Sequence, residues 1–304
     1  MTQLILIRPD IFLKNSFLKY LGWMLSDSSP LVREKAVAGL LAPFKVNEEE
    51  ISKKSNRRKS GSPRIDTGLM VSIAEKFARR LADCTMDVDL TVQERAMELL
   101  LAFARESLLD NVEDEELWKD INSRALAKDT TPIVRRDSLL FVIEQLEAFD
   151  NSNIRSEKDA VERINALASW TTHCIATNNT PLNKIPFERV GYVISSLRVC
   201  PEHASLVSNY SAILQALQDC GNTSASKNKR RLEVIQRHVL IEMLVASVEQ
   251  EMSSLDQSSL EGVVDESMTA ALRANEEHHK DSKKKRKTEG SQEKLTTAIL
   301  AMLP

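Results

Sequence analysis

The sequence lacks the patterns of sheets and of membrane spans. Glycine is scarce, at 8 of 304 residues, and no stretch alternates apolar and polar residues as a half-buried strand does. No run of about 18 apolar residues occurs, so we expect no membrane-spanning helix, and the first residues are too short for a secretory signal. With 42% apolar and 28% charged residues, the composition is typical of a globular protein that can bury a large core. The class predicted is all-α.

Motifs for catalysis and for metal binding are missing as well. The sequence has no Gly-rich phosphate loop, no pair of histidines at helical spacing and no nucleophile motif. His278 and His279 lie in a charged segment and are more typical of solvated residues than of metal ligands. Four cysteines are scattered without metal-site spacing, which favours a reducing compartment: Cys84, Cys174, Cys200 and Cys220. We therefore expect no enzyme, no cofactor and no metal site.

A turn signature recurs three times in one phase. Asp27, Asp87 and Asp129 each stand five positions before a valine, which is followed by a small residue four positions later and an apolar one eight positions later. At the first copy, Ser29 is predicted to be an N-cap and Pro30 the first residue of a helix. Each copy therefore predicts two antiparallel helices joined by a tight turn.

The spacing of the copies indicates the architecture. The second and third valines, Val92 and Val134, are 42 positions apart, inside the range of HEAT repeats. The first spacing is longer because a polar insert lies at 48–66. A helix pair cannot bury its apolar face alone, so we predict an α-solenoid of HEAT-type pairs that cover one another.

The domain organisation follows from these boundaries. Residues 1–150 hold three repeats, at 9–44, 68–105 and 113–149, and residues 151–274 continue as a helical solenoid without the turn signature. The helices expected there are 157–176, 187–198, 204–219, 227–253 and 259–274. Residues 275–291 form a polar, basic loop that we expect to be disordered, and residues 292–304 form a terminal helix.

Positive charge is concentrated in two runs. The two runs carry charges of +6 and +5, so the rest of the chain carries −14 of the net charge of −3. Such runs are often only solvated linkers, but the first suits contact with DNA and the second suits nuclear import. The first run comprises Lys53, Lys54, Arg57, Arg58, Lys59 and Arg64. The second comprises Lys283, Lys284, Lys285, Arg286 and Lys287.

Trp23 is the residue that departs from the repeat pattern. Its equivalents are Asp83 and Ala125, so the position is not consistently apolar, and we expect Trp23 off the core, near a groove or surface. The alternative is that it packs under a loop, since tryptophan is usually well buried. The next position along holds Met24, Cys84 and Leu126, which we expect in the core.

The strongest motif is specific to one family. The motif reads Phe17-Leu18-Lys19-Tyr20-Leu21-Gly22-Trp23, and it is followed by Asp27 and by Val32-Arg33. It resembles the stromalin conservative domain of the cohesin subunit SA (stromalin, STAG-type) family. Residues 240–247, the second basic run and 295–304 resemble later parts of that family. Family members extend further on both sides, so the chain is expected to be a fragment or a truncated gene product.

The resemblance implies a non-catalytic HEAT-repeat subunit of cohesin, located on chromatin in the nucleus. Its partners would be the kleisin subunit, other cohesin regulators and DNA, with no membrane and no small-molecule substrate. Arg79 and Arg80 would join the first basic run in binding DNA. The family's pocket for aromatic peptides would map to Lys19, Trp23, Lys76 and Phe77, with Lys76 where the family has arginine.

Two other function classes remain open at this point. One is a HEAT or armadillo adaptor for nuclear transport, or a general scaffold, although the repeated Trp-Asn positions of importin-type adaptors are missing. The other is an enzyme domain, which no motif supports.

Overall fold

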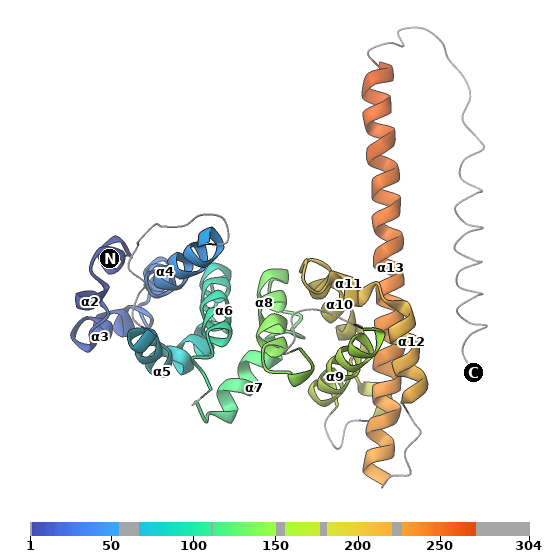
Figure 1. Cartoon of the computed structure of the whole chain (residues 1–304), viewed down its shortest axis with the longest axis horizontal. Coiled ribbons are helices and arrows are strands. Elements are labelled where there is room, and N and C mark those ends of the chain that lie inside the picture. Colours follow the sequence, from blue (N-terminus) through green and yellow to red (C-terminus); the bar gives the residue numbers. More distant parts are fainter. Residues whose placement is uncertain are drawn as a thin grey trace. The chain divides into compact units, whose positions relative to one another are not determined.

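The computed structural model describes residues 2–54, 67–110, 112–149, 156–176, 181–220 and 227–271 (Figure 1). Every regular element in those ranges is helical, which agrees with the predicted all-α class. The first half holds α1 (Thr2–Ile7), α2 (Pro9–Phe12), α3 (Asn15–Met24), α4 (Pro30–Lys54), α5 (Thr67–Cys84), α6 (Leu90–Arg105), α7 (Glu115–Arg124) and α8 (Pro132–Ile143). The second half holds α9 (Glu157–Ile175), α10 (Val190–Arg198), α11 (Ala204–Val207), α12 (Tyr210–Asp219) and α13 (Lys227–Ala271), with 3₁₀ turns η1 (Glu147–Phe149), η2 (Leu182–Lys184) and η3 (Phe187–Arg189).

Three helix pairs form the predicted repeats. Helix α3 packs on α4, α5 on α6, and α7 on α8, while the second helices α4, α6 and α8 also pack on one another in sequence. The small residue four positions after each turn valine is buried; these residues are Ala36, Ala96 and Ser138. In the third pair, the Ser138 hydroxyl donates to the carbonyl oxygen of Ile121 at 2.5 Å, so a polar side chain at this buried position is satisfied by the neighbouring helix.

The helix start predicted at Pro30 is confirmed. Helix α8 begins in the same way at Pro132, where proline suits the first turn because its missing N–H would be unpaired anyway. The carbonyl of Ser29 accepts the first helical bonds of α4, from the amides of Val32 and Arg33. Helix α4 runs through Pro43 to Lys54, so it extends ten residues beyond the predicted end of the first repeat and into the polar insert.

Two boundaries in the second half differ from the prediction. The helix expected at 204–219 is divided into α11 and α12, because the Asn209 side chain accepts the amide of Ala212 at 3.1 Å and starts a new helix. The helices expected at 227–253 and 259–274 are one continuous helix, α13 (Figure 1). The segment between them contains neither proline nor glycine, the two residues that most strongly disfavour a helix.

The chain divides into two compact units, Met1–Gln250 and Glu251–Pro304. In the first unit, α13 buries a stripe at helical spacing that includes Ile235, Val239 and Met243, and α9 packs on α12. The described part of the second unit is the C-terminal portion of α13, up to Ala271. None of the helices described is both long and apolar enough to cross a membrane.

Candidate functional site

The turns within the repeats are built by aspartate side chains. Asp27 accepts the amide of Ser29, and Asp87 accepts the amide of Asp89, each at 2.8 Å. Both are Asx turns, in which a short carboxylate bonds the backbone two residues on. The third copy differs, because there Thr131 caps the helix through the amide of Val134 at 3.2 Å. The recurring aspartate thus has one structural role in the first two turns only.

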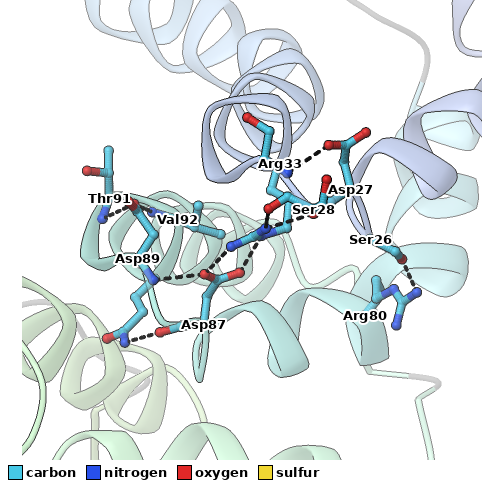
Figure 2. Close-up of polar contacts among 11 residues, drawn as sticks. Ser26, Asp27, Ser28, Arg33, Arg80, Asp87, Asp89, Thr91 and Val92 are labelled. Atoms are coloured by element: carbon cyan, nitrogen blue, oxygen red, sulfur yellow. Dashed lines mark hydrogen bonds and ion pairs between the residues drawn. The ribbon is translucent and has the colours of Figure 1, made fainter.

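The residue after each turn valine ties the repeats together. Arg33 donates from Nε and Nη2 to both carboxylate oxygens of Asp87, each at 2.7 Å, and from Nη1 to the carbonyl of Asp27 at 2.7 Å (Figure 2). This fork joins the first turn to the second across 54 positions of sequence. Burial alone would raise the pKa of Asp87, but the bonds from Arg33 and from the Asp89 amide outweigh it and hold the pKa below its ordinary value.

The residues at the equivalent position in the second and third repeats, Gln93 and Arg135, also bond to the turns. Gln93 donates to the carbonyl of Asp87 at 2.5 Å and accepts from Arg124 at 3.2 Å and from Thr130 at 3.0 Å. Arg135 donates to the carbonyl of Thr130 at 2.7 Å, and its guanidinium lies 4.6 Å from the centre of the Tyr192 ring. We call this row the turn ladder; it comprises Arg33, Asp87, Gln93 and Arg135. The sequence pattern placed these residues in register but did not indicate their contacts.

The outer face of α3 carries the aromatic residues singled out by the sequence. Trp23 is 67% exposed, and its ring meets that of Tyr20 edge-on at 5.3 Å. Lys19 is exposed, and its ammonium lies 5.0 Å from the centre of the Tyr20 ring. The prediction that Trp23 lies off the core is confirmed. The prediction that Met24 is a core residue is wrong: Met24 is half-buried, and Leu25, at 2% exposure, takes the core position.

The α5 residues of the predicted peptide pocket meet α3 at two different places. Phe77 is buried, and a Cβ built on Gly22 would lie 3.4 Å from its ring, so Phe77 fills the α3–α5 contact below the surface. Lys76 is exposed and donates to Asn15, at the start of α3, and to Ser72. Asn15 is eight residues from Trp23, about 12 Å along a helix. Lys19 and Trp23 thus share one face, while Lys76 contacts the other end of α3.

The two arginines assigned to DNA are held by acids and by the first turn. Arg79 lies 3.1 Å from Asp120, 3.5 Å from Asp83 and 4.0 Å from Asp114. Arg80 donates to the Ser26 hydroxyl and lies 3.9 Å from Asp83. Because these pairs are solvent-exposed they contribute little to stability, but they reduce the positive charge that either arginine offers to a phosphate.

The remaining basic residues are described in part or not at all. Lys53 and Lys54 belong to the last turn of α4. Arg57, Arg58, Lys59 and Arg64 of the first run lie outside the described residues, as do Lys283, Lys284, Lys285, Arg286 and Lys287 of the second run. The predicted loop 275–291 and helix 292–304 lie outside them as well.

One cavity of about 300 Å³ was not foreseen from the sequence. It is lined by residues of α4, α6 and α8 and by the segment 199–202. Asp137 is buried at its wall and accepts from Nε of Arg136 at 2.7 Å. Burial raises the pKa of the Asp137 carboxyl, and the bond from Arg136 offsets part of that effect. In the ranges that the structure covers, no group of three or more His, Cys, Asp or Glu side chains is placed to hold a metal ion.

These contacts define a HEAT-type α-solenoid: helix pairs stacked through their second helices and connected turn to turn. Comparison with known proteins shows what parts of the chain are similar to. The stromalin conservative domain matches residues 1–55, a range that closes one residue after α4. The predicted resemblance to the SA (stromalin) family is thereby confirmed.

A curated relative extends the similarity beyond the first repeat. Cohesin subunit psc3 of Schizosaccharomyces pombe is 24% identical over 217 residues, which cover 70% of this chain and 19% of the relative. The chain therefore matches about a fifth of the length of that protein. No solved structure matches the chain.

Proposed function

We propose that this chain is a non-catalytic HEAT-type part of an SA-type cohesin subunit. The observation that supports it is that the stromalin match, 1–55, covers α1 to α4 and so includes the whole first helix pair, whose second helix ends at Lys54. Stacked helix pairs offer long surfaces for partner chains. The partners proposed are the kleisin subunit, along the helical surface, together with cohesin regulators and DNA, on chromatin in the nucleus.

Co-purification with kleisin tests this proposal. The whole chain, carrying an affinity tag, should retain the kleisin of the same organism through a salt wash, and should not retain a peptide with a basic nuclear-import signal. The second probe represents the rival class, a transport adaptor. Retention of the import signal without kleisin would favour the adaptor and count against the cohesin subunit.

A peptide site on the outer face of α3 is part of the proposal. Lys19, Tyr20 and Trp23 present a cation and two aromatic rings to solvent, a combination that suits an aromatic peptide with an acidic neighbour. Lys76 and Phe77 complete the site by resemblance to the family. Phe77 would support it from below, because its ring packs under Gly22.

The peptide site has its own test. Trp23→Ala should weaken binding of an aromatic, acidic peptide at least about tenfold, as expected for an aromatic anchor. Val199→Ala, which truncates an exposed apolar residue after α10, is the matched control. Equal affinity of the two variants would remove Trp23 from the site.

DNA contact is proposed for the first basic run, and nuclear import for the second. The first run places six basic residues between positions 51 and 64 with no acid among them in the sequence, whereas Arg79 and Arg80 are paired with aspartates. We therefore assign the larger share of phosphate contact to Lys53, Lys54, Arg57, Arg58, Lys59 and Arg64. Because that run contains no aromatic residue to stack on bases, binding should not depend on sequence.

A further inference from the structure

The second turn carries exposed apolar side chains where the other turns carry polar ones. With the three turn aspartates aligned, Met86 takes the position of Ser26 and Lys128. Val88 takes the position of Ser28 and Thr130. The three turns connect the same kind of helix pair, so the fold does not require apolar residues at these two positions. Their presence in one turn needs another cause.

These side chains are exposed on two turns that the contact between Arg33 and Asp87 joins. Val88 is 93% exposed, Met86 56%, Leu90 51% and Leu31, at the neighbouring turn, 65%. We call these four residues the turn patch. Single exposed apolar residues are ordinary, but a group of them marks a contact surface. The backbone of the second turn is held in place because Asp87, between Met86 and Val88, accepts two hydrogen bonds from Arg33 (Figure 2).

The charges around the turn patch are unbalanced toward the negative. The positive charge of Arg33 is matched by Asp87, and Arg80 faces Asp83 and Ser26. The side chains of Asp27 and Asp89, which accept backbone amides, add acidic groups in the same two turns. A partner with lysine or arginine beside its apolar residues would complement them.

The arrangement of the turns favours a helical partner. Helices α4 and α6 pack on each other and Arg33 bonds to Asp87, so the first and second turns are neighbours. An amphipathic helix presents apolar residues at i, i+3, i+4 and i+7 on one face and polar residues beside them. Such a helix can cover exposed apolar residues of two turns while its basic residues meet the aspartates there.

We propose that the turn patch binds a basic, amphipathic helix of a partner protein. Apolar side chains of that helix cover Val88, Met86, Leu90 and Leu31, and its basic residues lie against Asp27 and Asp89. The proposal does not depend on the cohesin assignment. The turn patch would serve any scaffold that holds a helical segment at the edge of its repeats.

A binding assay with designed peptides tests the proposal on the whole chain. The probe is a fluorescein-labelled helical peptide with leucines at i, i+3, i+4 and i+7 and lysines elsewhere, followed by fluorescence polarisation. Two matched probes have the same composition with scrambled leucines, or glutamate in place of lysine. The variant is Met86→Ser with Val88→Ser, which installs the residues of the first turn and so preserves its folding. Val199→Ser is the control for loss of an exposed apolar side chain elsewhere.

The expected result is binding of the leucine–lysine helix that falls at least about tenfold in the double variant and is unchanged in Val199→Ser. The scrambled and glutamate probes should bind more weakly than the first probe. Equal binding by the double variant and the unaltered chain would overturn the proposal. Equal binding of the scrambled probe would also overturn it, because attraction of opposite charges would then explain the affinity without the apolar patch.

Discussion

The end of α3 places two large side chains, two residues apart, in opposite environments. Leu25 is 2% exposed, so Leu25→Ala removes buried methyl groups and leaves a cavity, at a cost of about 2–5 kcal/mol. Trp23 is 67% exposed and loses mainly its edge contact with Tyr20 on truncation. Contacts of that kind contribute about 0.5–1.5 kcal/mol. We therefore expect the smaller side chain to matter more for stability.

Thermal unfolding followed by far-UV circular dichroism measures the difference without relying on tryptophan fluorescence. Each kcal/mol shifts Tm by about 2–4 °C in a domain of this size, so Leu25→Ala should melt several degrees below Trp23→Ala. Met24→Ala should fall between them, because Met24 is half-buried. A loss for Trp23→Ala equal to that for Leu25→Ala would show that Trp23 is packed in the core, and the peptide site on α3 would lose its basis.

Four further predictions follow from the turn ladder, the repeat contacts and the basic runs. Because the pKa of Asp87 is lowered in the folded chain, its contribution to stability is complete above its unfolded pKa of about 4 and is lost as the pH falls through the folded value. Asp87→Asn should therefore make acid unfolding less steep in melts at successive pH values; an unchanged profile would show that the Arg33 contact does not favour the charged form. Ser138→Ala should cost about 0.5–1.5 kcal/mol in denaturant unfolding through loss of its bond to the Ile121 carbonyl, and a neutral result would mean that the close approach of α7 and α8 needs only a small residue. A reporter fused to residues 280–289 should accumulate in nuclei, and even distribution would identify the second basic run as a solvated segment. If about four phosphates are neutralised, duplex DNA binding should fall with a log–log salt slope of roughly −3.6, and the slope should flatten when alanine replaces Lys53, Lys54, Arg57, Arg58 and Lys59; an unchanged slope would exclude the first run from DNA contact.

Local features of the sequence determined the repeats. The helix start at Pro30, the turn aspartates and the apolar spacing depend on a few adjacent residues, so they could be predicted without knowledge of the neighbouring helices. The stromalin motif was recognised for the same reason, since its residues are adjacent in the chain. The division of 204–219 was local too: Asn209 is a favourable N-cap, but a capping side chain inside an apolar pattern was not enough to predict a break.

Contacts between distant residues were decided only by the tertiary structure. Arg33 and Asp87 are 54 positions apart, and nothing in either turn indicates which acid the arginine meets. Helical spacing marks an apolar stripe but not its edges, and the neighbouring helices bury Leu25 and leave Met24 half-exposed. Phe77 was assigned to a surface pocket by resemblance, yet the absence of a side chain at Gly22 lets its ring fill the α3–α5 contact. The sequence thus determined which segments are helices and how they pair, because those interactions are local, whereas packing between pairs determined which side chains remain available to a partner.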